Sequence, residues 1–435
     1  MSHENKPVII GVDFGGISSS AAFALDNNNG KNPELKVLDQ WPRATPRFLE
    51  QVLENAEIES IVYYDQTFKV TGWSDHEDAV ITRQDRVKPG LYVLRNFKSE
   101  LFPPEDYPEE LKATIRVPGK TAEDITVDYL RHLRASVLLQ VQQQLEKLKR
   151  GRGSLRVTIT TPSFWNEEAK ARFRETATNA GFAAEPDEKL DLISGLEAAT
   201  LHAEFMQPAV FLVGETFLVV DCGGHVVEAA AFEVQAKNPS RLKKRTKVSA
   251  SSCGSAEVTR RFLNIMNGKI DRTGIPSSKV WAKRGMRHRC RNQFETEVLL
   301  ELGKVTFQPP SEDLSGFWVA DVGVEIDCPE ADLTEGYMSF SEDEVYSCFD
   351  FAVERTLELV KEQIAAVHAQ GLQLHGCLLV GGFNKCVYYS DRVQTGFAAL
   401  GLRTIHSDHD PLAFAKGAVL AGLNDSIGHT RVAQE

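Results

Sequence analysis

The sequence predicts an α/β protein built from two lobes, and three observations lead to this fold class. The chain has 435 residues, which is too many for one compact hydrophobic core. Apolar runs short enough to be strands alternate with helical patterns, which is typical of sheets with a parallel component. Two such runs, residues 8–16 and 217–224, each end in an aspartate followed by glycines, and they lie in different halves of the chain. A pattern present once in each half predicts two lobes of similar design.

The two glycine-rich turns also indicate a chemistry. Asp13 precedes Gly15 and Gly16, and Asp221 precedes Gly223 and Gly224. Glycine allows backbone N–H groups to close on phosphate oxygens, so a strand–turn–strand of this kind can hold a phosphate group. An aspartate at the end of a strand can hold Mg²⁺ through the water shell of the ion. The repeated turn therefore predicts a clamp with a nucleotide between the lobes.

Composition narrows the classes of partner. A formal net charge of −12 argues against a nucleic-acid-binding protein, which needs a basic surface. The one basic run, residues 241–247, predicts a solvated hairpin tip, with a binding patch as the alternative. Seven cysteines without a Cys-x-x-Cys pair indicate a reducing compartment and give no zinc motif. No secretion signal and no stretch of membrane-spanning length is evident, so we expect a cytoplasmic protein without membrane contacts.

In the first half, local patterns predict the elements that follow the first turn. Apolar residues at three- or four-residue steps predict a long helix, and Asn166 is placed to cap the helix after it. The expected strands are residues 18–25, 61–64, 69–71, 155–160 and 190–194, and the expected helices are residues 123–150, 167–179 and 196–206. Residues 41–120 are mixed and rich in proline, which predicts a peripheral subdomain of a first lobe spanning residues 1–205.

The second half predicts a lobe over residues 206–435, with a peripheral subdomain at about 251–334. Small residues at 251–255 indicate a turn, and Ser341 is placed to cap a long helix. The further expected elements are helices at 292–307, 342–369 and 412–423, and a strand at 377–380 that leads into Gly381 and Gly382. The last helix is rich in alanine and glycine, which predicts close structural packing near the lobe junction.

Taken in order, these segments resemble the ATPase domain of the seventy-kilodalton heat-shock chaperones, within the actin and sugar-kinase superfamily. The closest resemblance is to the divergent heat-shock-like proteins common in filamentous fungi. The segments that carry it are residues 11–15 and 221–224 (the two phosphate motifs), 96–98, 160–165, 193–199 (the connecting segment), 301–307 and 379–383 (the adenosine motif). The resemblance implies two ribonuclease-H-like domains with a deep cleft between them. The chain ends soon after the last helix, so we expect no peptide-binding domain of the chaperone type.

The resemblance also implies roles for individual residues. Asp13 and Asp221 would hold Mg²⁺ through water, Asp221 would orient the attacking water, and Lys98 would offset charge on the transferred phosphoryl group. These three are the expected catalytic residues, and the expected cofactors are ATP or ADP with Mg²⁺. The residues expected to contact the nucleotide are Gly15, Gly16, Gly223, Gly224, Gly254, Glu301, Lys304, Gly381, Gly382 and Lys385. Lys385 stands where the chaperones often have an arginine that stacks on adenine, and lysine stacks less well.

Several positions depart from the chaperone pattern. Gly16 and Ile17 replace two hydroxyl residues of the first phosphate turn, while His225 and Val226 replace a glycine and a threonine of the second. Gly195 removes a carboxylate from the connecting segment. The loss of one positioned group commonly costs about 2–4 kcal/mol of barrier, so several losses together would slow turnover strongly.

Two hypotheses therefore remain open. The chain is an active, slow ATPase whose lobes move with nucleotide state and which has a chaperone-like or regulatory role. Alternatively, it is a degenerate pseudo-ATPase used as a binding or scaffold protein, or its cleft serves another small-molecule reaction such as a biosynthetic step, with His225 available as an acid or base. A sugar kinase would share the two turns, but no separate substrate motif supports it. A protein client or co-chaperone is not identified by the sequence.

Overall fold

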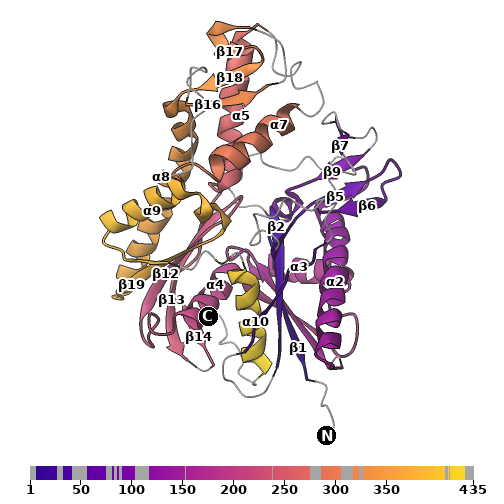
Figure 1. Ribbon diagram of the computed structural model, residues 1–435. Helices are drawn as coiled ribbons and strands as arrows, with labels where there is room; N and C mark the ends of the chain where they lie inside the picture. The colour runs from indigo at the N-terminus through magenta and orange to yellow at the C-terminus, as the bar shows by residue number, and fades with distance from the viewer. Residues whose placement is uncertain are drawn as a thin grey trace.

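The computed structural model describes residues 6–26, 33–41, 56–74, 81–82, 86–87, 91–102, 117–151, 153–237, 239–274, 286–304, 317–322, 327–406, 410 and 412–426. These residues form a mixed α/β structure with two six-stranded sheets and three smaller ones (Figure 1). The predicted α/β class is confirmed.

The first large sheet is built around the first glycine-rich turn. β1 (Val8–Phe14) pairs antiparallel with β2 (Ser18–Leu25) across that turn and parallel with β10 (Leu155–Thr161) on its other side. β10 in turn pairs parallel with β11 (Glu188–Ser194). The sheet has the order β11-β10-β1-β2-β3, with β3 (Lys36–Leu38) at its edge and β4 (Glu57–Glu59) also pairing with β2. The central strands are almost fully buried, which explains their continuous apolar runs.

The second large sheet repeats this connectivity. β12 (Thr216–Cys222) pairs antiparallel with β13 (Val227–Ala236) across the second turn and parallel with β19 (Leu374–Val380). Its order is β14-β13-β12-β19-β20, with β14 (Arg241–Lys244) and β20 (Thr404–His406) at the edges and β15 (Ser249–Ser251) pairing with β13. The prediction of a hairpin tip at 241–247 is wrong in part, because residues 241–244 form an exposed edge strand.

Two helices pack against the first sheet (Figure 1). α2 (Ala122–Lys147) begins with a capping box, in which the Thr121 side chain accepts from the Asp124 N–H and the Asp124 side chain accepts from the Thr121 N–H. Its buried residues recur at three- and four-residue steps, as predicted, although the helix ends before 150. α3 (Glu167–Asn179) is capped by Asn166, whose side-chain oxygen accepts from the Ala169 N–H at 2.8 Å. Both predicted helices are confirmed.

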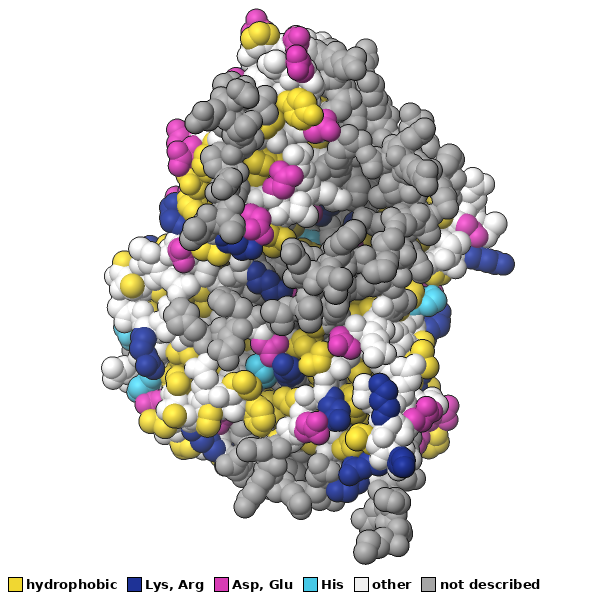
Figure 2. Space-filling model, in the orientation of Figure 1, with side chains coloured by type: hydrophobic (Ala, Val, Ile, Leu, Met, Phe, Trp, Pro, Cys, Tyr) yellow, Lys and Arg dark blue, Asp and Glu magenta, His cyan; other side chains and the backbone are white. Residues whose placement is uncertain are grey.

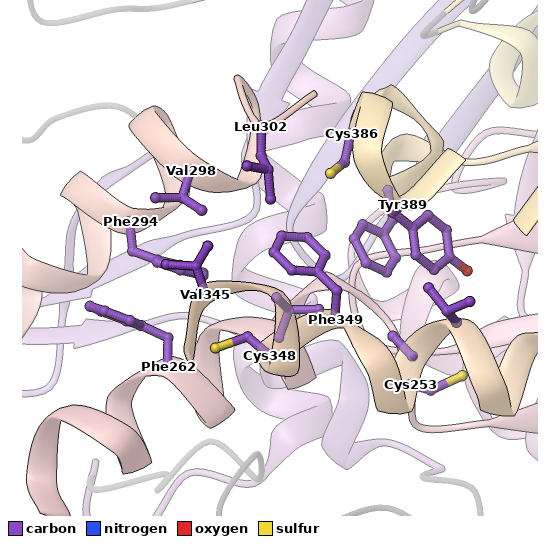
Figure 3. Packing of buried hydrophobic residues seen from close by; sticks show 14 of the residues in the cluster. Cys253, Phe262, Phe294, Val298, Leu302, Val345, Cys348, Phe349, Cys386 and Tyr389 are labelled. Carbon is purple, nitrogen blue, oxygen red and sulfur yellow. The ribbon is translucent and has the colours of Figure 1, made fainter. Parts of the chain in front are cut away.

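The core of the second half is formed by α5 (Ser255–Arg272), α8 (Glu342–His368) and α9 (Val387–Ala399) with one face of the second sheet. Ser341 caps α8 through a capping box with Glu344, which confirms the predicted start of this helix. Figure 3 shows side chains from these helices pointing toward one another, with Phe262 of α5 beside Phe294. Their ring centroids are 4.2 Å apart in a stacked arrangement.

Two helices lie between the large sheets (Figure 1). α4 (Gly195–Met206) and α10 (Ala413–Ser426) pack against each other so closely that a Cβ added at Gly417 would lie 1.9 Å from the Ala198 carbonyl oxygen. Only glycine permits this approach. The predicted structural role of the Ala/Gly-rich terminal helix is confirmed, with the helix at 413–426 rather than 412–423.

The peripheral elements of the first half are three-stranded and two-stranded sheets. The strands predicted at 61–64 and 69–71 are confirmed and pair antiparallel on either side of Asp65. These elements are β5 (Val62–Tyr64), β6 (Val70–Trp73), β9 (Tyr92–Leu94), β7 (Ile81–Thr82), β8 (Arg86–Val87) and a short 3₁₀ helix, η2 (Phe97–Glu100). Much of the predicted subdomain at 41–120 lies outside the described residues.

The peripheral elements of the second half correct one predicted helix. Instead of one helix over 292–307, α7 (Met286–Gln293) passes into a π-helical segment, η4 (Phe294–Leu299), which ends in a turn. Residues 305–307 lie outside the described part of the chain. The other elements here are β16 (Trp318–Asp321), β17 (Leu333–Thr334), β18 (Tyr337–Phe340) and two 3₁₀ helices, η5 (Pro329–Ala331) and η6 (Gly382–Lys385).

The described surface gives no sign of a membrane span or of one dominant charge. Among the described residues, no helix combines the length and the apolar character needed to cross a bilayer. On the face shown in Figure 2, the described basic and acidic side chains are interspersed. A broad basic surface of the kind that binds nucleic acid is therefore not a feature of this described face.

Candidate functional site

A cavity of about 570 Å³ is lined by residues from both large sheets and from the elements that connect them. Of the residues singled out from the sequence, those that line it are Asp13, Gly15, Gly16, Ile17, Lys98, Gly195, Asp221, Gly223, Gly224, His225, Val226, Gly381, Gly382 and Lys385. Glu228 lines it as well. This volume lies within the range of small-molecule sites, about 300–1,000 Å³. Residues far apart in the sequence thus meet around one cavity.

Asp13 and Asp221 occupy the same position in the two sheets. Each is the sixth residue of a seven-residue first strand, and each is the only residue of its strand that is not fully buried. The hydroxyl of Thr160, on the neighbouring strand β10, donates to Oδ1 of Asp13. Burial raises the pKa of Asp13, and it raises the pKa of Asp221 well above its usual range, with Glu228 and Asp13 adding to the rise at Asp221. The carboxylate of Asp13 thus adds to the cost of ionising Asp221.

Lys98 is held at the cavity by its neighbour in the short helix η2. Phe97 is buried against the rings of Phe14 and Tyr129, at centroid distances of 6.3 and 5.5 Å, which fixes the orientation of η2. The Nζ atom of Lys98 then donates to the Phe14 carbonyl oxygen and lies 5.0 Å from the centre of the Phe14 ring. Burial lowers the pKa of Lys98, while Asp13, Glu228 and Asp221 oppose that change.

Glu228 adds a third carboxylate to this group. It lies on β13 directly across from Asp221, and both of its oxygens accept from the Ser163 N–H at 3.0 Å. Ser163 follows β10 of the first sheet, so this contact joins the two halves. Burial raises the pKa of Glu228, and Lys98 and the hydrogen bond from Ser163 oppose the rise. No local sequence signal identifies this role of Glu228, because its partner Ser163 lies far away in the chain.

The balance of charge at this end of the cavity suits a bound cation. Three carboxylates, those of Asp13, Asp221 and Glu228, face the single positive charge of Lys98. No group of three or more metal-binding side chains with ligand geometry occurs among the described residues. Carboxylate oxygens are the donors that a hard ion such as Mg²⁺ prefers, so this donor set fits such an ion.

The two glycine-rich turns are in direct contact with each other. A Cβ added at Gly16 would lie 2.8 Å from Nδ1 of His225, and a Cβ added at Gly224 would lie 2.3 Å from Cδ1 of Ile17. Each turn thus places a bulky side chain against a glycine of the other turn. Burial lowers the pKa of His225 to about 4, with Arg291 and Lys98 contributing, so its imidazole is neutral at pH 7. Gly16, Ile17 and His225, which depart from the chaperone pattern, are therefore packed together with Gly224.

The turn after β19 reaches the cavity beside Asp221. Gly381 has a φ of 96°, and a Cβ there would lie 2.3 Å from Oδ1 of Asp221, so glycine is required for both reasons. Lys385, at the end of η6, pairs with Glu57 of β4 through an Nζ to Oε2 distance of 2.9 Å. Glu57 also accepts from the Ser18 hydroxyl at 2.9 Å. In this structure the Lys385 amine is bonded across the cavity to the first half.

Three predicted nucleotide contacts do not line the cavity. Gly254 lies behind the second turn, where its N–H donates to the His225 carbonyl oxygen at 3.2 Å. Glu301 and Lys304 form an ion pair with each other at 2.8 Å in the turn after η4. Their expected partner in the motif, Phe307, lies outside the described residues.

This side of the cavity is lined instead by residues just before Glu301 and Lys304 in the chain. Phe294, Val298 and Leu302 point into the hydrophobic core (Figure 3), so the opposite side of this segment faces the cavity. The residues on that side are Arg291, Asn292, Glu295, Thr296, Leu299 and Leu300. The apolar spacing 294, 298, 302 was present in the sequence and indicates which side of this segment is buried.

Gly195 lies at the start of α4, as the connecting-segment resemblance predicts, and lines the cavity without a carboxylate. A Cβ there would make only ordinary contacts, the nearest at 3.6 Å to the Phe414 ring. Crowding therefore does not explain the glycine.

Comparisons with known proteins agree with this architecture. No protein-family model matches the chain. The chain is 23% identical to heat shock 70 kDa protein 12B of Homo sapiens, over 98% of this chain and 70% of that protein. It is 21% identical to heat shock 70 kDa protein 12A of Mus musculus, over 97% of this chain and 70% of that protein. This similarity is low but extends along almost the whole chain, and it supports a heat-shock-70-like domain of the actin-like ATPase type.

Proposed function

We propose that this chain is a heat-shock-70-like nucleotide-binding protein that holds an adenine nucleotide with Mg²⁺ in the cavity and hydrolyses ATP slowly or not at all. The proposal includes a two-lobed actin-like fold, with a first lobe over residues 1–205, a second over 206–435 and the cavity between them. It also includes a cytoplasmic location and a chaperone-like or regulatory role.

The observation that carries the proposal is the matched placement of Asp13 and Asp221. They stand at equivalent positions in two sheets of the same strand order, and both line one cavity with Lys98. Burial raises the pKa of both carboxylates, and Asp13 adds to the rise at Asp221, so keeping the two ionised without a cation is costly. Strands that end in glycine turns around such a pair are suited to phosphate groups.

Within this proposal the residues divide the work as follows. Asp13 and Asp221 hold Mg²⁺ through water, and the ion supplies positive charge to phosphate oxygens. Lys98 supplies a second positive charge, at a position fixed by Phe14 and Phe97. Gly381 and Gly382 leave room for the nucleoside beside Asp221.

The same geometry supports the proposal of slow or absent hydrolysis. Ile17 and His225 lie between the turns, where donors to phosphate would be needed, and Gly195 offers no carboxylate to position a water molecule. Both Glu228 oxygens are engaged by the Ser163 N–H. Removal of one positioned group costs about 2–4 kcal/mol of barrier, so the combined effect lowers turnover to near background.

A second candidate is a binding or scaffold protein without nucleotide turnover, or a cavity adapted to another small molecule. The contact between the two turns favours it, because Gly16 with His225 and Gly224 with Ile17 fill each other's space without any ligand. A neutral, buried His225 is also available for proton transfer in another reaction.

Calorimetric titration with ADP and Mg²⁺ tests the proposal. We expect binding by the wild type, at least tenfold weaker binding by Asp13→Asn and Asp221→Asn, and no change for Asp65→Asn. Asp65 is the matched control because it is a carboxylate in an exposed hairpin and does not line the cavity. Phosphate release from ATP, measured in the same variants, should be slow in the wild type and absent in Asp221→Asn.

Two results would separate the candidates. Failure of the wild type to bind any adenine nucleotide at millimolar concentration would remove the nucleotide proposal and favour the second candidate. Equal affinity of wild type and both cavity variants would show that the two carboxylates do not hold Mg²⁺.

A further inference from the structure

We infer that the cavity prefers a nucleoside or nucleoside monophosphate to the corresponding triphosphate, because Ile17 and His225 occupy the space between the turns that a phosphate chain needs. This inference rests on the proposed function and refines it by naming the class of ligand. It identifies Ile17 and His225 as the residues that set specificity.

The first part of the argument is steric. The Ile17 side chain lies against Gly224 so closely that a Cβ on that glycine would be 2.3 Å from its Cδ1 and 2.7 Å from its Cγ1. The His225 ring of the second turn lies against Gly16 of the first turn, so that a Cβ added at Gly16 would be 2.8 Å from Nδ1 of His225. These two reciprocal contacts fill space between the turns that phosphate oxygens would need in order to meet the N–H groups of both.

The second part is chemical. Ile17 is 44% exposed and lines the cavity, so an apolar side chain without donors faces the ligand at this end. His225 is buried and uncharged near neutral pH. The adjoining carboxylates outnumber Lys98, so each phosphate added to a ligand brings negative charge toward Asp13, Asp221 and Glu228. One hydrated cation offsets part of this repulsion but cannot supply the missing donors.

The rest of the cavity remains suited to a nucleoside. Leu299 and Leu300 give an apolar surface for a planar base, while Asn292, Glu295 and Thr296 on the same segment give hydrogen-bonding groups. Gly382 and Asn384 line the facing side. The cavity volume of about 570 Å³ accommodates a ligand of this size.

A triphosphate can enter only if the two turns separate. The affinity of such a ligand is reduced by the fraction of molecules in which they are apart. A nucleoside or its monophosphate binds without that change. Affinity should therefore fall as phosphates are added, which is the reverse of the order expected for an ATPase site.

Calorimetric titration with adenosine, AMP, ADP and ATP at one fixed Mg²⁺ concentration tests the inference. In the wild type we expect ATP to bind at least tenfold more weakly than AMP. In the double variant Ile17→Ala/His225→Gly we expect ATP to bind at least tenfold more tightly, with less than threefold change for AMP. Leu300→Ala is the matched control, because Leu300 is an exposed apolar residue of the same cavity outside the turns, and it should change all four affinities alike.

The single variant Ile17→Ala provides the test if the double variant does not fold, since it only shortens a partly exposed side chain. It should move the ATP-to-AMP affinity ratio in the same direction. Tightest binding of ATP by the wild type, or an unchanged ratio in both variants, overturns this inference and leaves the proposed nucleotide site standing. Binding of none of the four ligands by the wild type overturns the proposed function itself, and this inference with it.

Discussion

Replacing Lys98 by methionine should destabilise the protein strongly at neutral pH and much less in acid. Lys98→Met keeps most of the side-chain volume but removes the positive charge that faces Asp13, Asp221 and Glu228. The Phe14 carbonyl oxygen loses the hydrogen bond from Nζ in the same variant. Three carboxylates are then left close together with no opposing lysine.

The magnitude follows from the burial of this group. Removing one partner of a buried ion pair costs about 3–5 kcal/mol, and the lower value applies because the cavity admits water. The carboxylates respond by taking up protons, so the pKa values of Asp13, Asp221 and Glu228, already raised, rise further in the variant. A carboxyl group whose pKa is higher in the folded than in the unfolded state lowers the free energy of unfolding as pH rises, because the unfolded chain ionises more readily. The difference between wild type and variant should therefore be about 3 kcal/mol at pH 7 and shrink as pH falls toward about 4.

Urea unfolding at several pH values, with the m value checked, measures this difference. Lys385→Met is the matched control, because Lys385 is a half-exposed lysine whose ion pair with Glu57 is worth at most about 1 kcal/mol. The reasoning would be refuted if Lys98→Met lost no more free energy of unfolding at pH 7 than Lys385→Met. A loss that does not depend on pH would refute it as well.

Two further predictions concern the turns. Gly16→Ala should destabilise the wild type by about 1–3 kcal/mol, because its Cβ would lie 2.8 Å from Nδ1 of His225 and no positive φ is required at Gly16. In a His225→Gly background, Gly16→Ala should lower the free energy of unfolding by less than about 0.5 kcal/mol. A double-mutant cycle measured by urea unfolding checks this, and a coupling energy near zero between the two positions would disprove the contact. The pKa of His225, about 4 when folded against an ordinary 6.5, means that the unfolded chain binds a proton in this interval and the folded chain does not. Stability of the wild type relative to His225→Asn should thus rise by up to about 3 kcal/mol from pH 4 to pH 6.5 and then level off, and a flat difference over that interval would show that the ring is not buried as described.

Much of the fold could be predicted because its signals are local. The capping residues Asn166 and Ser341 start the helices for which they were proposed, since a cap acts on N–H groups within three residues. The runs before Asp13 and Asp221 form central strands because their apolar residues are buried on both faces of a sheet. Helix α10 could be assigned to close packing from its alanine and glycine content alone.

The set of residues that line the cavity was predicted less completely than the fold. Glu301 and Lys304 were placed by motif resemblance, but stacking of Phe294 on Phe262 and the π-helical segment fix which residues face the cavity. Lys385 lines the cavity, and its amine pairs at 2.9 Å with Glu57, a residue of the other half. A pairing between such distant positions leaves no periodic trace in the sequence.

The sequence by itself determined which segments become strands and helices and which two carboxylates end the central strands, because propensity, capping and burial patterns act over a few residues. Only the tertiary structure decided that the turns bearing Ile17 and His225 interlock and that Glu228 bonds to the Ser163 backbone. These contacts depend on how the two sheets are positioned by α4 and α10 between them. That position is the sum of many packing contacts between distant residues, and no single stretch of chain encodes it.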